Sequence, residues 1–82
     1  MVLRIVKSLL FNKNINKLDN SSIVYAKKLI KKIVENPEIG KPMRYERKGT
    51  RELYIKPFRI SYEYHSHDDK LEFLSIYHKK KQ

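Results

Sequence analysis

Apolar and polar residues alternate over residues 58–65 of this chain. The apolar positions and the polar positions between them form two sets, namely Phe58, Ile60, Tyr62 and Tyr64 against Arg59, Ser61, Glu63 and His65. A second stretch rich in apolar residues runs from residue 71 to residue 80, after a polar His-Asp-Asp sequence at 67–69. Alternation in the first stretch, followed by a polar turn and a second stretch rich in apolar residues, predicts a β-hairpin with one buried and one polar face.

The two strands of this hairpin are expected to pair in one register. Pairing Ile60 with Ile76 and Tyr62 with Leu74 sets apolar residues opposite one another and leaves a three-residue loop at 67–69. A slip of one residue would mix the two faces, so the sequence favours this pairing.

This register gathers hydrogen-bond donors on the polar face. Arg59 stands opposite Tyr77, with Lys79 as its diagonal neighbour, while His78 lies at the edge of the buried face. A guanidinium, a phenol and an ammonium close together suit a bound phosphate, because the guanidinium offers a planar set of donors. The alternative is a surface arginine that pairs with Glu63 or another acid.

The first half of the chain has helical spacing instead. Apolar residues recur every three to four positions at 10–18 and again at 23–34, and residues 19–22 are good N-cap candidates between the two stretches. The second helix should end before Pro37, because the residue that precedes a proline avoids the α conformation. Two helices joined by so short a loop predict an antiparallel helical hairpin.

Short strands are also expected at residues 2–6 and 51–56. Together with the C-terminal hairpin they indicate a single domain over residues 1–82. The expected fold class is α+β, with an N-terminal two-helix hairpin packed on a small, mainly antiparallel sheet of three to four strands. A chain of this length buries only a small core, so we expect no large active-site cavity.

The composition adds a strong positive charge. Nineteen Lys and Arg residues against nine Asp and Glu give a formal net charge of +10, which favours nucleic acid, an acidic protein or an anionic membrane surface as partner. The chain has no cysteine, which excludes disulfides and thiolate chemistry. No apolar run approaches the roughly 20 residues of a membrane span, so we expect a soluble cytoplasmic protein that does not span a membrane.

Four segments carry a resemblance to a known family. They are GKPMR at 40–44, KGTRELYI at 48–55, FRISYEY at 58–64 and LSIYHKK at 74–80. Together with the order of the expected elements, they resemble the RelE/ParE toxin superfamily, and in particular its RelE-like ribosome-dependent mRNA interferases. The resemblance implies a RelE-like fold and the toxin of a type II toxin–antitoxin system. It also implies an endoribonuclease that cuts mRNA in the ribosomal A site by 2′-hydroxyl attack, without a metal or other cofactor.

The resemblance implies roles for individual residues. The strand arginine of the family falls on Arg59, which would contact the scissile phosphate, and a second family arginine falls on Lys79. Where RelE has two lysines on the preceding strand, this chain has Glu52 and Tyr54, and some relatives use a carboxylate as the base. The catalytic candidates are therefore Arg59, Lys79, His78, Tyr77 and Glu52.

The resemblance also indicates the partners. We expect the RNA to be contacted by basic residues around the site, namely Arg44, Arg47, Lys48, Arg51, Lys56 and Lys80. The expected partners are the ribosome, mRNA and an acidic RelB-like antitoxin that wraps the toxin and allows a toxin–antitoxin heterotetramer. Two other functions stay open: a non-nucleolytic, ParE-like inhibitor of DNA gyrase, and a plain basic RNA-binding module.

Overall fold

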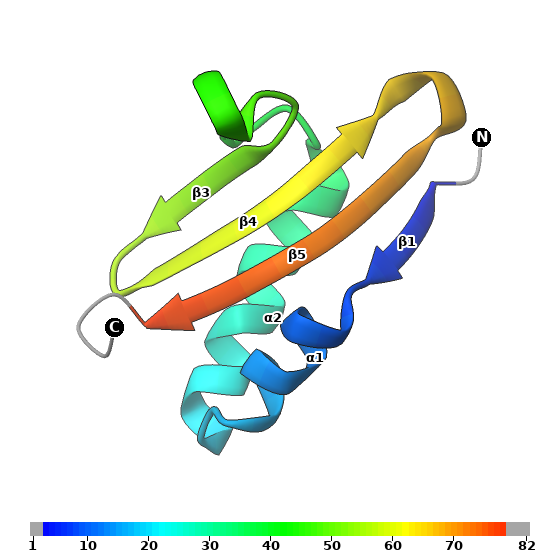
Figure 1. Cartoon of the computed structure of the whole chain (residues 1–82). Helices are drawn as coiled ribbons and strands as arrows, with labels where there is room; N and C mark the ends of the chain where they lie inside the picture. Colours follow the sequence, from blue (N-terminus) through cyan, green and yellow to red (C-terminus); the bar gives the residue numbers. More distant parts are fainter. Residues whose placement is uncertain (1–2, 79–82) are drawn as a thin grey trace.

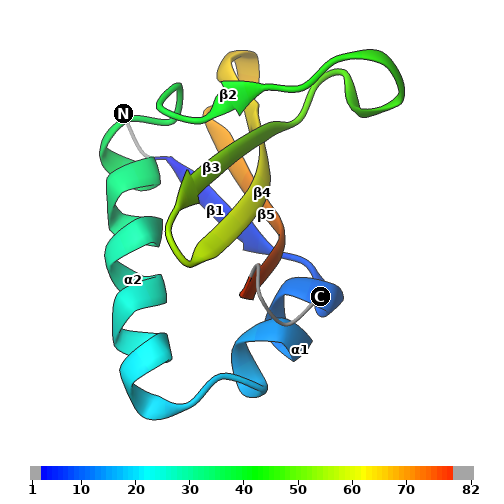
Figure 2. The same cartoon turned by 90° about the vertical axis from the view of Figure 1, so that its left-hand side faces the viewer.

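The computed structural model describes residues 3–78, apart from the side chain of Arg47. Two helices cover one face of a twisted sheet and leave the other face open (Figures 1 and 2). The expected α+β fold, with a helical hairpin on a mainly antiparallel sheet, is confirmed. No helix within residues 3–78 combines the length and the apolar character needed to cross a membrane.

The helices begin where the sequence supplies caps. Helix α1 spans Leu9–Asn16, and the hydroxyl of its N-cap Ser8 accepts a hydrogen bond from the backbone N–H of Phe11. Helix α2 spans Asn20–Glu35, and its N-cap Asp19 accepts from the N–H of Ser22 at 2.8 Å. Side-chain acceptors at these positions satisfy donors that the first helical turn leaves unpaired. The predicted end of the second helix before Pro37 is confirmed.

The sheet has five strands in the order β1-β5-β4-β3-β2. Their bounds are Arg4–Lys7 for β1, Lys41–Pro42 for β2, Arg51–Ile55 for β3, Phe58–His65 for β4 and Lys70–His78 for β5. Strand β1 pairs in parallel with β5 at one edge, and the other pairs are antiparallel. The sequence predicted three to four strands, because a two-residue edge strand such as β2 is too short to show an alternating pattern.

The predicted register of the hairpin is correct at one end and wrong at the other. Ile60 pairs with Ile76 as expected, but Tyr62 pairs with Phe73 and not with Leu74, because a β-bulge shifts the register between Ser61 and Tyr62. Leu74 is the extra residue of that bulge. The shift lengthens the expected loop at 67–69 to residues 66–69, since His65 now pairs with Lys70.

The bulge has a packing cause that is visible in the buried residues of β5. Leu71, Phe73 and Ile76 are all buried, and their spacing of two and then three residues cannot place all three on one face of a regular strand. One extra residue between Phe73 and Ile76 restores the alternation on both sides. The bulge therefore lets the strand fill the core along its whole length.

Ser8 and Asn14 bind backbone groups of β5 at and beyond the bulge, where β1 no longer pairs with that strand. The hydroxyl of Ser8 donates to the carbonyl of Leu74 at 2.8 Å, and the side-chain carbonyl of Asn14 accepts from the N–H of Ile76 at 3.1 Å. Buried backbone groups must be paired, and these two groups face a helix and not a strand. Asn14 is a poor helix former, and this hydrogen bond explains its position in α1.

The core lies between the helices and the inner face of the sheet. Its helical members are Phe11, Ala26, Leu29 and Ile33, and its strand members are Leu53, Phe58, Ile60, Tyr62, Leu71, Phe73 and Ile76. The rings of Phe11 and Phe73 stack at 5.3 Å across the two layers. This packing fixes the sheet and thereby positions the polar side chains on its opposite face.

Candidate functional site

Three side chains form a row across the open face of the sheet. Arg59 of β4 pairs in register with Tyr54 of β3 on one side and with Tyr77 of β5 on the other. Its guanidinium carbon lies 5.8 Å from the ring centre of Tyr54 and 6.0 Å from that of Tyr77. Arg59 Nη1 also donates a hydrogen bond to the Tyr77 hydroxyl at 3.4 Å. Two aromatic neighbours thus orient the arginine without neutralising its charge.

A carboxylate lies beside this arginine. Glu52 Oε1 is 3.6 Å from Arg59 Nε, and Glu52 Oε2 accepts a hydrogen bond from Ser61 Oγ at 3.4 Å. The side chain of Glu52 is 10 % exposed and that of Arg59 27 %, so water screens this pair less than a fully exposed one. The alternative partner Glu63 lies instead 3.6 Å from His65 Nε2. Arg59 therefore has an acidic partner while part of its guanidinium side chain stays accessible.

An open groove of about 450 Å³ adjoins the row at its β3 end. Its apolar lining comes from the segment between α2 and β3 as well as from β3 itself. The lining residues are Ile39, Lys41, Met43, Glu52, Leu53, Tyr54 and Arg59. The groove thus places apolar and charged side chains next to each other at the surface.

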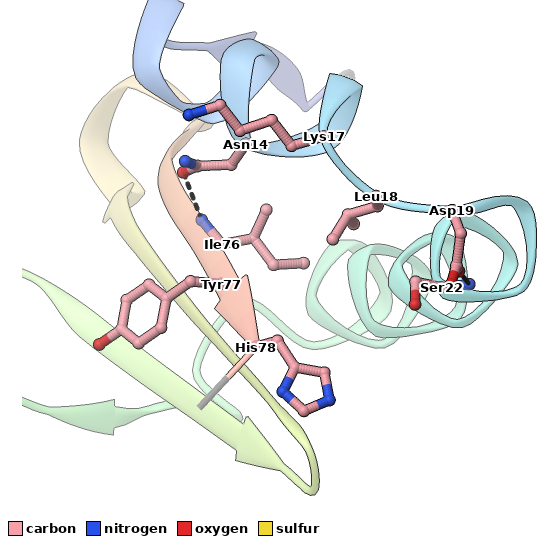
Figure 3. A pocket seen from close by; sticks show the side chains of 8 residues that line it. All are labelled: Asn14, Lys17, Leu18, Asp19, Ser22, Ile76, Tyr77 and His78. Atoms are coloured by element: carbon pink, nitrogen blue, oxygen red, sulfur yellow. Dashed lines mark hydrogen bonds between the residues drawn. The ribbon is translucent and has the colours of Figure 1, made fainter. Parts of the chain in front are cut away.

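His78 lies on the helix-facing side of the sheet, as the alternation predicted. Its ring packs edge-on against Phe58, with ring centres 5.3 Å apart. Figure 3 shows the rings of Tyr77 and His78 on opposite sides of β5. The structure therefore brings Glu52, Arg59 and Tyr77 together and places His78 apart from them.

His78 also lines a second pocket, of about 230 Å³, under the turn between the two helices (Figure 3). The other lining residues are Asn14, Lys17, Leu18, Asp19, Ser22, Ile76 and Tyr77. Asn14 and Asp19 already serve the backbone here, since Asn14 binds the N–H of Ile76 and Asp19 caps α2. Within residues 3–78, no three His, Asp or Glu side chains gather in a way that could hold a metal ion.

The predicted RNA-binding residues divide into groups. Arg44, Lys48 and Lys56 are exposed, the first two in the loop between β2 and β3 that projects beyond the sheet (Figure 2). The side chain of Arg47 and the whole of Lys79 and Lys80 lie outside the described residues. The proposed roles of all these residues stay predictions.

Arg51 has a structural role that the sequence did not reveal. Its Nη1 donates to the backbone carbonyls of Glu38 at 3.1 Å and Gly40 at 2.8 Å, and its Nη2 lies 4.0 Å from the Glu38 carboxylate. Arg51 pairs in register with the buried Tyr62, which puts it on the helix-facing side of β3. It thus holds the segment after α2 and lies on the other side of the sheet from Arg59.

The hydroxyl of Tyr62 holds the same segment. It accepts a hydrogen bond from the N–H of Gly40 at 2.8 Å and donates one to the carbonyl of Pro37 at 2.7 Å. Burial raises the pKa of the Tyr62 phenol, although the hydrogen bond from Gly40 and the charge of Arg51 oppose this shift. A Cβ atom at Gly40 would lie 2.6 Å from the hydroxyl oxygen, so only glycine fits there.

The sequence carried a signal for Tyr54, which the resemblance named beside Glu52, but none for the residues at the other side of the groove. Alternation along β3 puts Tyr54 on the same face as Glu52, opposite the buried Leu53. Ile39 and Met43 reach the groove from an irregular segment, in which no periodic pattern predicts direction.

Comparisons with known proteins agree with this architecture. A family model described as the ParE toxin of the type II toxin–antitoxin system parDE matches residues 5–82. The RelBE2 toxin–antitoxin complex of Mycobacterium tuberculosis contains a chain with the same fold, at a TM-score of 0.84 and 18 % identity, covering 93 % of this chain and 90 % of that one. No curated protein sequence matches this chain.

Two further solved structures share the fold. The intact RelBE toxin–antitoxin complex of E. coli matches at a TM-score of 0.76 and 14 % identity, over 92 % of this chain and 94 % of that one. The YoeB/ParE toxin of Agrobacterium tumefaciens matches at a TM-score of 0.79 and 15 % identity, over 93 % and 98 %. At these identities the likeness establishes the fold alone.

Proposed function

The chain belongs to the ParE toxin family of type II toxin–antitoxin systems, and on this premise we propose that it is an endoribonuclease that cleaves mRNA on the ribosome. The observation that supports the proposal is the cluster of Glu52, Arg59 and Tyr77 on the open face of the sheet. In this cluster the guanidinium of Arg59 contacts both the carboxylate of Glu52 and the phenol of Tyr77. These groups can supply the base, the charge stabilisation and the acid of a metal-independent cleavage of RNA.

The proposed reaction begins at the ribose. Glu52 accepts the proton of the 2′-hydroxyl as its oxygen attacks the adjacent phosphorus, and Arg59 stabilises the charge that develops on the phosphate oxygens. The bond to the 5′-oxygen of the next nucleotide breaks, which leaves a 2′,3′-cyclic phosphate and a 5′-hydroxyl. Arg59 Nε now lies 3.6 Å from the Glu52 carboxylate. To stabilise the phosphate, the guanidinium must turn some of its N–H donors from Glu52 to the phosphate oxygens.

Tyr77 is the proposed donor of the leaving-group proton. Its hydroxyl oxygen accepts from Arg59 Nη1, so the hydroxyl proton points elsewhere and is available for the departing 5′-oxygen. The ring of His78 packs on Phe58 on the helix-facing side of the sheet, so it cannot donate a proton to a phosphate on the open face in this arrangement. Lys79, which follows it, remains the candidate for a second cation at the site.

The surface charge supports an RNA substrate that is held by the ribosome. Arg44 and Lys48 on the projecting loop and Lys56 at the turn between β3 and β4 are exposed cations, with Arg47 and Lys80 as further candidates. A net charge of +10 also favours ribosomal RNA as a docking surface. The same charge suits an acidic antitoxin, and the RelBE chains of similar fold were solved in toxin–antitoxin complexes.

Inhibition of DNA gyrase is the second candidate function. It is favoured by the matching family model, which describes ParE toxins. The ion pair between Glu52 and Arg59 also fits a protein in which this arginine only supports the sheet. On this alternative, substitutions in the row would change stability without changing any RNA product.

Mapping of RNA 5′ ends after induction of the toxin in cells separates the two functions. Nuclease action predicts new 5′ ends at a fixed phase within translated codons, and it predicts their loss in an untranslated copy of the same message. Gyrase inhibition predicts double-strand DNA breaks with intact mRNA. Intact mRNA in an induced and growth-arrested culture would refute the nuclease.

A further inference from the structure

The groove beside Arg59 has features that phosphate binding alone does not require. Its volume of about 450 Å³ far exceeds the space that one guanidinium contact needs. The exposed side chains of Ile39 and Tyr54 give it apolar walls, with 40 % and 47 % of their surfaces accessible. Apolar walls at an open surface, next to a cluster of charges, indicate a site for a flat and partly apolar ligand.

Tyr54 is the central wall of this groove. Arg59 lies over its ring at 5.8 Å, and the register of β3 and β4 fixes the two residues directly opposite each other. Because the strands are held by the core beneath them, the ring stands beside the guanidinium of Arg59 before any ligand arrives. An aromatic ring fixed next to a phosphate-binding cation is the arrangement with which proteins hold single-stranded nucleic acid.

We propose that the groove is a nucleobase subsite, in which Tyr54 stacks on the base of a nucleotide whose phosphate Arg59 holds. The inference rests on the proposed role of Arg59 as the phosphate contact. Ile39 and Met43 line the edge of the base, and Lys41 supplies charge for a neighbouring phosphate. Stacking tolerates any base, so this subsite provides affinity and position for the RNA, and the choice of codon depends on other contacts.

The subsite is tested with an RNA that the protein can bind but not cleave. A single-stranded trinucleotide with 2′-O-methyl riboses has no free 2′-hydroxyl, so its dissociation constant measures binding alone. We expect Tyr54→Leu to weaken binding about 5- to 150-fold, the factor that corresponds to one stacked base. Tyr54→Phe, the matched control, keeps the ring and should bind as the parent protein does. In NMR spectra the methyl group of Met43 should shift on titration.

A second probe isolates the base from the backbone. Versions of the trinucleotide that lack one base at a time keep every phosphate. One abasic trinucleotide should bind the parent protein more weakly, by a factor similar to that of Tyr54→Leu. The affinity of this abasic trinucleotide should not fall further when Tyr54→Leu is the protein. Equal affinity of Tyr54→Leu and the parent, or equal affinity of all abasic probes, would overturn the subsite.

This result is independent of the nuclease assay. Base-dependent binding by a protein that leaves translated mRNA intact would retain the subsite and remove the proposed cleavage. Cleavage at the parental rate by Tyr54→Leu, together with unchanged trinucleotide affinity, would remove the subsite and retain the nuclease. Absence of any trinucleotide binding by the parent at millimolar concentration would also overturn the inference.

Discussion

Glu52 and Arg59 form an ion pair across strands β3 and β4, with Arg59 Nε 3.6 Å from Glu52 Oε1. The two residues are diagonal neighbours, since Glu52 pairs in register with Ser61 and Arg59 with Tyr54. This pair has two consequences. It fixes the arginine that is proposed to hold the phosphate, and it sets the candidate base beside the same phosphate.

Replacement of Arg59 tests the site most directly. Arg59→Ala is expected to lower the rate of mRNA cleavage on the ribosome by about 10²–10³, because it removes one preorganised donor to the developing charge. Arg59→Lys keeps the charge but not the bidentate geometry, so it should recover only part of the rate. Single-turnover cleavage of a ribosome-bound message measures both effects.

The stability of the same variants provides the control. Arg59→Ala leaves the nearly buried carboxylate of Glu52 without its cation, which should cost about 1–3 kcal/mol in the free energy of unfolding. In a Glu52→Gln background the same substitution should cost less, and the difference is the coupling energy of the pair. Additive costs in urea unfolding would mean that the pair contributes nothing to stability.

Glu52→Gln tests whether Glu52 acts as the catalytic base or has only a structural role. Glutamine keeps the size of the side chain and an acceptor for Ser61 Oγ, but it cannot take up the proton of the 2′-hydroxyl. We expect a loss of about 10²–10⁴ in the cleavage rate, with RNA affinity unchanged or higher because Arg59 loses its competing acid. A parental cleavage rate in the folded variant would exclude Glu52 as the base.

Tyr62 makes stability depend on pH in the alkaline range. Burial raises the pKa of its phenol in the folded state above the value of about 10 that tyrosine has in an unfolded chain. Above that pH the unfolded chain loses the proton that the folded protein retains, so stability is fully present at neutral pH and falls as the pH rises through the shifted pKa. Unfolding in urea from pH 8 to 11 should show this fall relative to Tyr62→Phe.

Tyr62→Phe should itself be destabilised at neutral pH. The substitution leaves the N–H of Gly40 and the carbonyl of Pro37 without their partner, which costs about 1–3 kcal/mol when such groups stay buried. Equal stability of the two proteins at pH 7 would show that water replaces the hydroxyl.

Asn14 is expected to stabilise the fold by pairing a backbone N–H of β5 just beyond the bulge. Asn14→Ala removes the acceptor for the N–H of Ile76 and should lower the free energy of unfolding by about 1–3 kcal/mol. Asn14→Asp keeps an oxygen in the same place and should lose less, despite the poorer helix propensity of aspartate than of alanine. Thermal unfolding of the parent protein, Asn14→Asp and Asn14→Ala measures the order of their stabilities. If Asn14→Ala were more stable than Asn14→Asp, Asn14 would not act as the acceptor for Ile76.

The salt dependence of RNA binding locates the basic surface. Arg44→Ala with Lys48→Ala should reduce the slope of log affinity against log salt by about one unit for each phosphate contact that is lost. The matched control removes two exposed lysines of α2, Lys28 and Lys31, which carry the same charge on the other side of the sheet. If the α2 variant shows the larger fall in slope, the RNA lies on the helices.

The sequence by itself determined both helices, four of the five strands and part of their pairing. Period-two alternation at 58–65 and helical spacing at 10–34 are local properties, because each follows from how neighbouring residues share one face. They sufficed to place Arg59 opposite Tyr77, to put His78 on the helix-facing side and to end α2 before Pro37.

Only the tertiary structure decided which polar groups meet. Filling the core required the bulge at Leu74. The backbone groups at and beyond the bulge are paired by Ser8 and Asn14, which lie 66 and 62 residues from their partners. The charge of Arg51, on which its predicted RNA contact rests, is visible in the sequence, whereas its hydrogen bonds to two backbone carbonyls are visible only in the structure. The Glu52–Arg59 pair likewise depends on the pairing of separate strands. Such contacts arise from packing and from the need to pair buried polar groups, and neither leaves a local pattern.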